Sequence, residues 1–494
     1  MEKQCDVVVI GGGGSGLVAA VRAAEHSGKK VIVLEKAKTT GGGMIMASTM
    51  RTFRSKWQKE RNLPDVTDAY LRKVMDATFW RLNPDLVRNA ILATGEFFDW
   101  FCDLIGENVG EQFRVGRYVF DDETGPLGPQ KGGRGGVTGG GRLFMDSLRK
   151  QCDRFDIEVL TEHPAKHVEV CKDGSYRVIA QGPKGEVSVL CNGLILAIGS
   201  WIHHEEMLKK RFPKFWEAKQ HMDASPHMNR NYTGDGFALA KELGAYREEE
   251  NYALRMMGPM VFSKSPVPAN LANTPYNIMV TKEGKRFACE PTQTRMGVFS
   301  SGLVLMEQPE GISYVIFDVA NLRAAIAAEK NTQAPEEGDV FDREPLPETV
   351  EEALESLQSV LEKEGIFRGE TILDLEKQLG ITSGKLQETV EEYNRDCRAG
   401  FDRKCFKEKD CLVELNEGPF FALRGKLGTD GAFGGILVNE NMQAYREAGG
   451  LLPNVYVTGD FASGRFLNMA GEKVQILNDM SWALASGFLA GSRV

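Results

Sequence analysis

The strongest constraint on this chain lies in its first 35 residues, where two apolar runs flank a glycine-rich turn. The β-branched run Val7–Ile10 is typical of a buried strand, and it leads directly into Gly-Gly-Gly-Gly-Ser-Gly at 11–16. An alanine-rich helical segment follows, and Val31–Glu35 forms the second apolar run. A glycine turn between a strand and a helix is the context in which this motif binds nucleotides. The sequence therefore predicts a βαβ unit that binds an adenine dinucleotide.

Each glycine of the turn has a separate expected role. Gly11 allows the tight turn, Gly13 lets the backbone approach a pyrophosphate, and Gly16 lets the helix pack closely on the strand. The free N–H groups and the positive dipole end of the helix then face the phosphates. Glu35 ends the second run nineteen residues after Gly16, where a carboxylate can bind ribose hydroxyls.

Composition argues against several classes of partner. The 494 residues carry a formal net charge of −9 without a Lys/Arg-rich run, so neither nucleic acid nor an anionic membrane surface is expected. No apolar run approaches the roughly 18 residues of a membrane span. The N-terminal sequence lacks a signal-peptide pattern, and a cytoplasmic protein is predicted. The nine cysteines include no CxxC pair, so no iron–sulfur, haem or zinc site is expected.

The chain after the glycine turn divides into segments of different character. Apolar spacing predicts a helix at 86–105, and the run 194–198 predicts a buried strand that ends at a glycine. From about residue 254 to 431, hairpin patterns precede a charged helical stretch. A strand at 452–460 and an apolar helix at 472–490 then complete the nucleotide-binding pattern. This order predicts an α/β nucleotide-binding domain interrupted by an inserted lobe.

Beyond the turn, a series of short motifs follows along the chain. They are the turn at 11–16, Glu35, GGG (41–43), LAIG (196–199), TGDG (233–236), EGKRF (283–287) and VYVTGD (455–460). In this order they resemble the fumarate reductase/succinate dehydrogenase flavoprotein superfamily over essentially the whole chain. The soluble branch of that superfamily includes flavocytochrome fumarate reductase, urocanate reductase, tricarballylate dehydrogenase and 3-ketosteroid dehydrogenases.

The resemblance implies an α/β fold in which a discontinuous Rossmann-type FAD-binding domain carries an inserted α+β capping domain. The FAD-binding domain is expected at 1–253 and 432–494, and a mobile capping domain over the flavin at 254–431. FAD is the implied cofactor, and the absence of a second GxGxxG turn gives no indication of a built-in NAD(P)H domain. The implied cofactor-binding positions are Gly11, Gly13, Gly14, Ser15, Gly16, Glu35, Lys36, Gly41, Gly42, Gly43, Ala165, Ala197, Gly199, Asp235, Gly459, Asp460, Gly471, Gln475 and Ile476.

The resemblance also implies a proton donor in the inserted lobe. In fumarate reductases an arginine follows a GxRFxxE segment and delivers the proton; the segment here is EGKRFACE, followed by PTQTR. Arg295 stands five residues after Glu290, one more than in the family pattern. Because a guanidinium hardly deprotonates in water, Arg295 would need a relay carboxylate, for which Glu290 is the candidate. The alternative is an arginine that pairs with a surface carboxylate or stabilises an enolate without donating a proton.

The carboxylate clamp of the fumarate reductases has no counterpart in this sequence. The family's histidine ahead of the C-terminal glycine pair is missing at 430–435, and its arginine before the last helix falls near Met469. Without those cations a dicarboxylate has little to hold its second charge. The tyrosine of ketosteroid dehydrogenases is also missing from that turn, where Phe466 and Leu467 stand. We therefore expect a larger or less charged substrate than fumarate or succinate.

The leading functional hypothesis is an FAD-dependent oxidoreductase that reduces an activated C=C bond, as in an enoate or enone. Hydride would pass from flavin N5 to the β-carbon, and the capping domain would protonate the α-carbon. No second redox site is visible, so an external donor such as a flavin reductase, ferredoxin or flavodoxin is expected. Two alternatives stay open: a dehydrogenase that desaturates a Cα–Cβ bond, and an electron-transfer flavoprotein subunit without catalysis of its own.

Overall fold

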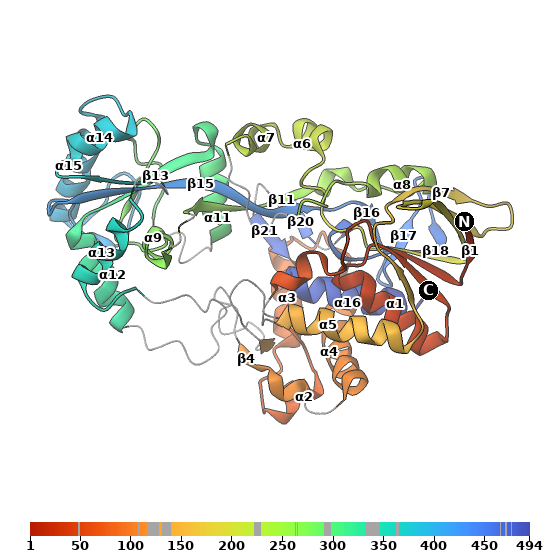
Figure 1. Ribbon diagram of the computed structural model, residues 1–494. Helices are drawn as coiled ribbons and strands as arrows, with labels where there is room; N and C mark the ends of the chain where they lie inside the picture. Colours follow the sequence, from red (N-terminus) through yellow and green to blue (C-terminus); the bar gives the residue numbers. More distant parts are fainter. Residues whose placement is uncertain are drawn as a thin grey trace.

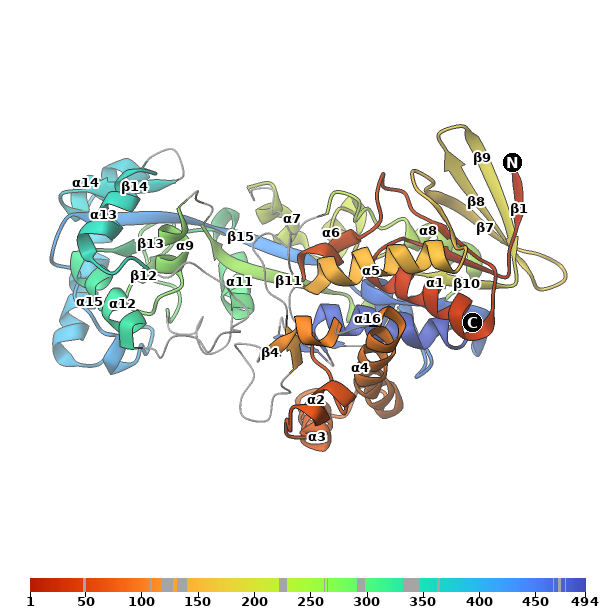
Figure 2. The same cartoon turned by 60° about the horizontal axis from the view of Figure 1, so that its bottom comes forward.

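Two long strands, β11 (Ala253–Met260) and β15 (Phe420–Phe433), join the two lobes of this elongated chain in the computed structural model (Figures 1 and 2). Both chain termini belong to the larger lobe. The structure describes the whole chain except residues 48–49, 107–108, 117–127, 131–139, 222–228, 262, 264, 291–297, 332–345, 362–364, 465, 470–471 and 476.

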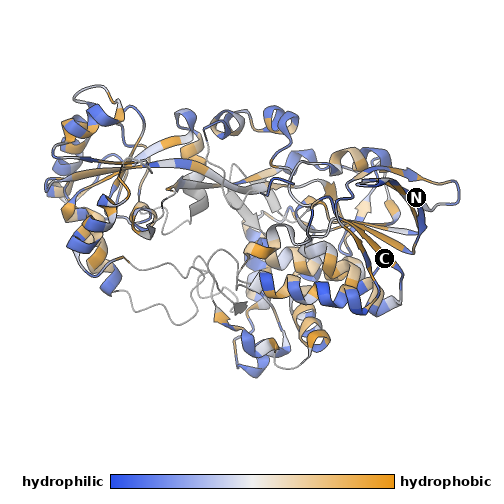
Figure 3. Cartoon of the chain, viewed as in Figure 1, coloured by the Kyte–Doolittle hydropathy of each residue, from blue (hydrophilic) through white to orange (hydrophobic). Residues whose placement is uncertain are grey.

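The larger lobe is built on a six-stranded sheet in which all neighbouring strands are parallel except β17 and β18. Its central strands β2 (Val7–Ile10) and β10 (Gly193–Leu196) consist of buried, mostly apolar residues, as expected for strands covered on both faces. In Figure 3 the strands of the larger lobe are coloured mainly as hydrophobic. Strands from both ends of the sequence share this sheet, which confirms the predicted α/β class and the discontinuous domain. In spatial order they are β17 (Gln443–Tyr445), β18 (Leu451–Val457), β10 (Gly193–Leu196), β2 (Val7–Ile10), β3 (Val31–Leu34) and β6 (Glu158–Leu160).

Helices α1 (Gly14–Ser27) and α16 (Asp479–Gly491) pack tightly against each other beside this sheet. Their close approach depends on glycine, because a Cβ at Gly487 would lie 2.4 Å from Ser15 O. A Cβ at Gly491 would similarly lie 2.5 Å from Ala19 O. This contact fixes the N-terminus of α16 relative to the glycine turn that begins α1.

The C-terminal helix is shorter than the sequence indicated. The predicted helix at 472–490 was wrong at its start, because Glu472–Gln475 forms strand β21, antiparallel to β20 (Phe466–Met469). The helix begins at Asp479, after the N-cap residue Asn478. The Asn478 side chain accepts a hydrogen bond from Ser481 N at 3.2 Å, which satisfies one of the free N–H groups of the first turn.

Among the described residues, the larger lobe also contains a four-stranded sheet and seven further helices. The predicted helix at 86–105 corresponds to the long helix α4. The strands, in spatial order, are β1 (Glu2–Gln4), β9 (Gly185–Cys191), β8 (Tyr176–Gly182) and β7 (Ala165–Val170). The helices are α2 (Lys56–Glu60), α3 (Thr67–Ala77), α4 (Pro84–Ile105), α5 (Gly140–Arg154), α6 (Glu205–Arg211), α7 (Pro213–Lys219) and α8 (Gly236–Leu243).

The smaller lobe is an antiparallel sheet with helices on both faces (Figures 1 and 2). Along β13 (Ile312–Phe317), Val315 and Phe317 belong to one buried core, whereas Tyr314 and Ile316 belong to a second core. This alternation is the period of two expected for a strand buried on both faces. The strands besides β11 and β15 are β12 (Ile278–Val280), β13 (Ile312–Phe317) and β14 (Ile366–Gly369), and the helices are α9 (Pro266–Ala272), α11 (Val298–Met306), α12 (Val319–Asn331), α13 (Val350–Gln358), α14 (Ile372–Leu379) and α15 (Lys385–Ala399).

The sheet of the smaller lobe starts at Ala253 and ends at Phe433, close to the expected limits of the capping domain, 254–431. Those domain limits stay a prediction. In the described part of the chain, no helix is both long enough and apolar enough to cross a membrane.

Candidate active site

The glycine turn leaves β2 and enters α1 with little room for side chains. Gly11 has a φ of 110°, and a Cβ there would lie 2.2 Å from Ala197 O. A Cβ at Gly16 would lie 1.9 Å from Gly11 O, so neither position accommodates a larger residue. Gly13 differs, because an added Cβ would meet no atom within 4 Å. The turn is therefore tightly packed against the protein and open at Gly13.

A cavity of about 740 Å³ begins at this turn and reaches the smaller lobe. Its volume lies within the roughly 300–1,000 Å³ common for small-molecule sites. The predicted cofactor positions that line it are Gly11, Gly13, Gly14, Ser15, Glu35, Lys36, Gly42, Gly43, Ala165, Ala197, Gly199, Asp235, Gly459 and Asp460.

Of the predicted positions that the structure describes, the remaining ones do not line the cavity. Gly16 packs under the turn against Gly11, and Gly41 forms a parallel bridge with Gly13. Gln475 belongs to β21. Three predicted positions lie outside the described residues: Arg295, Gly471 and Ile476.

A carboxylate lies where the cavity meets the end of β3. Glu35 Oε2 accepts a hydrogen bond from Gly12 N, and Glu35 Oε1 accepts one from Ala37 N, both at 2.7 Å. Each carboxylate oxygen has two lone pairs, so Glu35 keeps capacity to accept from a ligand hydroxyl. The two backbone bonds fix the orientation of the carboxylate toward the glycine turn.

Lys36 connects the end of β3 to the turn before α8. Its ammonium group donates hydrogen bonds to Asp235 Oδ2 and Thr233 Oγ1, each at 2.6 Å. Burial alone would raise the pKa of Asp235, but the hydrogen bond and charge of Lys36 outweigh it and hold this pKa below its usual value. Asp235 is therefore ionised at neutral pH, and its charge is matched by Lys36.

Helix α16 holds the turn that follows β18. Gly459 N donates a hydrogen bond to Ser486 Oγ at 3.0 Å, and Trp482 Nε1 donates one to Gly459 O at 2.8 Å. A Cβ at Gly459 would lie 2.8 Å from Ser15 Oγ, so the turn also packs on the start of α1. These contacts place Gly459 and Asp460 at the cavity, beside the glycine turn.

The far end of the cavity belongs to the strands and helices that lead into the smaller lobe. Its lining comes from β11 and the residue after it, and from α9 and the residue after it. The cavity is therefore shared between the two lobes. The lining residues from this part are Arg255, Gly258, Pro259, Met260, Val261, Ala269 and Asn273.

The sequence profile of the FAD binding domain family matches residues 6–470. The chain belongs to this family. The match includes the glycine turn, the inserted lobe and the turn after β18, so it covers both sides of the cavity. It confirms FAD as the cofactor and the predicted membership of the fumarate reductase/succinate dehydrogenase flavoprotein superfamily, a superfamily of oxidoreductases.

Known flavoproteins resemble this chain at low sequence identity. A vinyl phenol reductase of Lactiplantibacillus plantarum is 23% identical over 338 residues, which cover 66% of this chain and 65% of the relative. The open conformation of a flavocytochrome c3 fumarate reductase matches with a TM-score of 0.71 at 20% identity, over 99% of this chain and 78% of that one. A 3-ketosteroid-Δ4-(5α)-dehydrogenase from Rhodococcus jostii RHA1 matches with a TM-score of 0.68 at 21% identity, over 100% and 97% of the two chains.

These comparisons establish the family and the fold. The chain spans less than two thirds of the length of the first curated relatives that it matches. Both solved structures confirm the predicted architecture of an FAD-binding domain with an inserted lobe.

The described residues of this family member fit FAD in one orientation. Helix α1 has Gly13 as N-cap and no side-chain cap, so its first N–H groups are available to a diphosphate. Glu35 at the end of β3 suits the adenosine ribose. Strands β10 and β18 lie on the opposite side of β2 from β3. We therefore expect the isoalloxazine end of FAD near Gly199 and Gly459, which follow β10 and β18.

Replacing Glu35 with alanine should weaken FAD binding roughly tenfold to a hundredfold, since a hydrogen bond to a charged group contributes about 1.5–3 kcal/mol. The matched variant Glu35→Gln keeps an acceptor oxygen and should lose less affinity. Titration of flavin-free protein with FAD, followed by quenching of flavin fluorescence, measures both. An unchanged dissociation constant in Glu35→Ala would contradict the ribose role.

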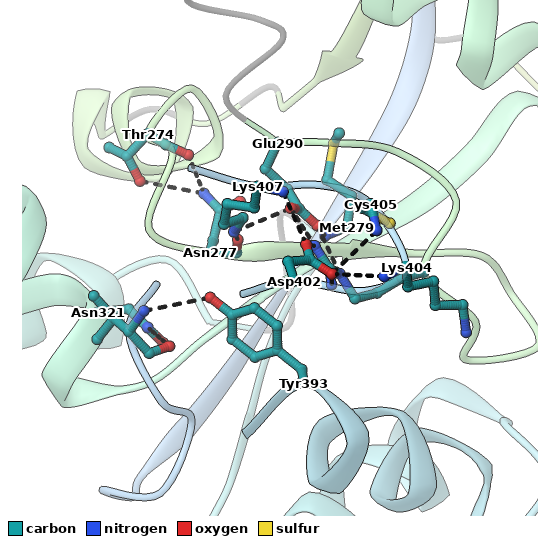
Figure 4. A network of polar contacts seen from close by, with 12 residues as sticks. Thr274, Asn277, Met279, Glu290, Asn321, Tyr393, Asp402, Lys404, Cys405 and Lys407 are labelled. Atoms are coloured by element: carbon teal, nitrogen blue, oxygen red, sulfur yellow. Dashed lines mark hydrogen bonds and ion pairs between the residues drawn. The ribbon is translucent and has the colours of Figure 1, made fainter. Parts of the chain in front are cut away.

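The structure places the candidate relay Glu290 in a buried polar network of the smaller lobe (Figure 4). Its Oε2 lies 2.8 Å from Arg286 Nη2 and 3.0 Å from Lys407 Nζ, and its Oε1 accepts a hydrogen bond from Met279 N at 2.8 Å. Arg286 also binds Asp402 at 2.9 Å. Glu290 is not part of the described cavity lining. Its role as a relay for the proton donor stays a prediction.

Both acids of this network are ionised in the folded protein. Burial alone would raise the pKa of Glu290, but the neighbouring Lys407 and Arg286 cations hold it below its usual value. Burial opposes ionisation of Asp402 too, but hydrogen bonds from Arg286 and the backbone lower its pKa to about 2. The side chains of all four residues are at most 2% exposed. The network is therefore two buried acids balanced by two buried cations.

Replacing Glu290 with alanine should lower the free energy of unfolding by about 3–5 kcal/mol, because two buried cations lose their partner. Folding lowers the pKa of both Glu290 and Asp402. The stabilisation that the ionised network gives the unmodified protein is therefore present above about pH 4 and is lost as the pH falls toward 2. Urea unfolding followed by far-UV circular dichroism measures it. The control Glu310→Ala removes an acid that is 38% exposed in its ion pair with Lys282 and should cost far less. Equal losses in the two variants would contradict this account of the network.

Sequence reasoning missed the cavity residues Arg255 and Asp479, which belong to none of the motifs. Arg255 lies within β11, and an arginine inside an otherwise apolar strand is the available signal for it. Asp479 was hidden by the wrong helix start at 472, which placed it two turns inside the predicted helix instead of at its N-terminus.

Proposed function

We propose that this flavoprotein reduces an activated C=C bond, such as that of an enone or enoate, in a substrate with little negative charge. The observation that carries the proposal is the shared cavity, which reaches from the glycine turn to β11 and α9. A substrate that enters at the junction of the lobes would lie against the isoalloxazine end of FAD. The smaller lobe would then exclude water from the reacting atoms.

The charge of the cavity supports a substrate other than a dicarboxylate. Both cations among the described lining residues are paired, Lys36 with Asp235 and Arg255 with Asp479. A dianion would therefore find an excess of carboxylates at this site, and like charges repel strongly where water is excluded. The charged lining residues in the described part of the chain are the acids Glu35, Asp235, Asp460 and Asp479 and the bases Lys36 and Arg255.

The end of the cavity next to the smaller lobe supports an apolar substrate skeleton. Pro259, Met260, Val261 and Ala269 supply apolar surface there. One N–H of the Asn273 amide donates to Ala269 O, and its second N–H suits a substrate carbonyl. Two of the proteins described above agree with this choice. One is named a vinyl phenol reductase, and the ketosteroid dehydrogenase structure is a complex with 4-androstene-3,17-dione. A vinyl phenol and this steroid dione are both uncharged molecules.

Bound FAD would supply the hydride for the β-carbon of the alkene. The chain would contribute the positioning and the proton. Asn273 and the apolar lining would hold the alkene in place, and Arg295 of the inserted lobe is the proposed proton donor to the α-carbon. The electrons would come from an external donor, for which a flavin reductase, ferredoxin or flavodoxin is the proposed class.

The proposal is tested by anaerobic reoxidation of dye-reduced, FAD-loaded protein with a panel of alkenes. Enones and aryl alkenes should restore the absorbance of oxidised flavin at least tenfold faster than fumarate. Failure of every alkene to accept electrons, or a preference for fumarate, would overturn the proposal. A dehydrogenase would give a different result: a saturated ketone would remove the absorbance of the oxidised flavin, and the corresponding enone would fail to reoxidise the reduced protein.

A further inference from the structure

An ion pair at the cavity joins the strand that leads into the smaller lobe to the last helix of the larger lobe. A guanidinium nitrogen of Arg255, on β11, contacts Asp479 Oδ2 at the start of α16. The Arg255 side chain is 9% exposed and the Asp479 side chain 29%. Both residues line the cavity, so both charges act on whatever it holds.

This pair lies at the flavin end of the site. The adenosine end is set by Glu35 at the end of β3, on one side of β2. The start of α16 lies on the other side, because it is hydrogen-bonded through Trp482 to Gly459 after β18. The cavity residues Met480 and Ala483, on the same helix, extend this part of the lining.

Asp479 is not needed to cap its helix. The N-cap function belongs to Asn478, whose side chain accepts the hydrogen bond from Ser481 N. Tight packing of α16 on α1 also fixes the place of this carboxylate, since Gly487 meets Ser15 O too closely for any larger residue. Asp479 is therefore a fixed negative charge at the cavity, with Arg255 as its counter-charge.

We propose that the Arg255–Asp479 pair sets the electrostatic environment of the flavin and thereby the balance between its oxidised and reduced forms. Reduction adds two electrons from the external donor and one proton, so the reduced flavin gains one negative charge. Arg255 stabilises that charge and Asp479 opposes it, and both effects are strong in a site of low dielectric. The two residues act through their charges on the flavin and are positioning residues.

The arrangement also couples the flavin to the connection between the lobes. Arg255 pairs in register with Gly431 of β15, within the strand pair that joins the two lobes. A displacement of β11 would therefore move the positive charge relative to Asp479, which is anchored in the larger lobe.

The test is the equilibrium for two-electron reduction of FAD-loaded protein, measured against a reference dye by absorbance. Asp479→Asn should raise the equilibrium constant for reduction at least tenfold, and Arg255→Met should lower it by a similar factor. A tenfold change corresponds to about 30 mV for a two-electron couple. Arg255→Lys keeps the charge and should stay close to the unmodified protein. The matched control Arg323→Met removes an arginine that is 56% exposed in its pair with Glu417 and should change nothing.

Opposite shifts in Asp479→Asn and Arg255→Met support the proposal. Shifts in the same direction, or no shift in either variant, would overturn it and leave the pair a purely structural contact. If Arg255→Met does not retain FAD, Asp479→Asn decides alone, because asparagine has nearly the same shape as aspartate. The measurement needs bound FAD but no alkene, so its result is independent of the proposed substrate.

Discussion

Replacing Gly13 with leucine should abolish FAD retention and leave the protein folded. The backbone at Gly13 has a φ of −77°, which any residue adopts, and an added Cβ would meet no protein atom within 4 Å. The larger side chain would project into the open side of the turn, where we expect the diphosphate to bind the first N–H groups of α1. We expect FAD affinity to fall at least about a hundredfold, or about 2.7 kcal/mol, with the free energy of unfolding of the flavin-free protein within about 0.5 kcal/mol.

A second glycine variant separates loss of binding from loss of folding. A Cβ at Gly16 would lie 1.9 Å from Gly11 O, so Gly16→Ala should lower the thermal midpoint of the flavin-free protein as well as its FAD affinity. Differential scanning calorimetry and FAD titration distinguish the two patterns. Unaltered FAD affinity in Gly13→Leu would place the diphosphate elsewhere.

Replacing Arg295 with alanine should lower the turnover of an alkene by about 10²–10⁴-fold, the usual contribution of a general acid. FAD should stay bound and the protein yellow, because Arg295 is not among the predicted cofactor-binding positions. The measurement is single-turnover reoxidation of the reduced protein by the best alkene of the panel, with flavin content determined in the same sample.

Two further variants identify the chemistry of this residue. Arg295→Lys keeps the positive charge and should recover part of the rate if charge stabilisation contributes. Glu290→Gln keeps the shape of the proposed relay but removes its charge. A slowing of turnover supports a relay to Arg295 only if the variant remains folded under the assay conditions, which urea unfolding of the same sample checks. Unchanged rates in Arg295→Ala would remove the residue from the mechanism.

Local sequence patterns were sufficient for the βαβ unit at which the cavity begins, and the roles of its residues in holding FAD stay predictions. The apolar run Val7–Ile10, the glycine turn and Glu35 are close in sequence, and each has a role that its own residue type dictates. The structure gives a steric reason for Gly11 and Gly16 and an open space at Gly13. The α/β class and the discontinuous domain followed from the same motifs, because both ends of the chain carried nucleotide-binding patterns.

Contacts between distant segments account for what the sequence did not reveal. The GxRFxxE motif contains both Arg286 and Glu290, but the other two members of the buried network, Asp402 and Lys407, lie more than a hundred residues away. The motif alone therefore gave no sign of the complete network. The start of α16 was misplaced because three of the four residues at 472–475, Glu, Lys and Gln, are good helix formers, whereas pairing with β20 makes the segment a strand. Arg255 reaches the cavity through the fold of the inserted lobe, which no single motif encodes.

The most direct test is a calorimetric titration of flavin-free protein with FAD, in the unmodified chain and in Gly13→Leu. We predict one FAD bound per unmodified chain, with the absorbance of protein-bound oxidised flavin, and no detectable binding by the variant. A chain that stays colourless with excess FAD, or a Gly13→Leu variant that binds as tightly as the unmodified protein, would contradict an FAD site at the glycine turn.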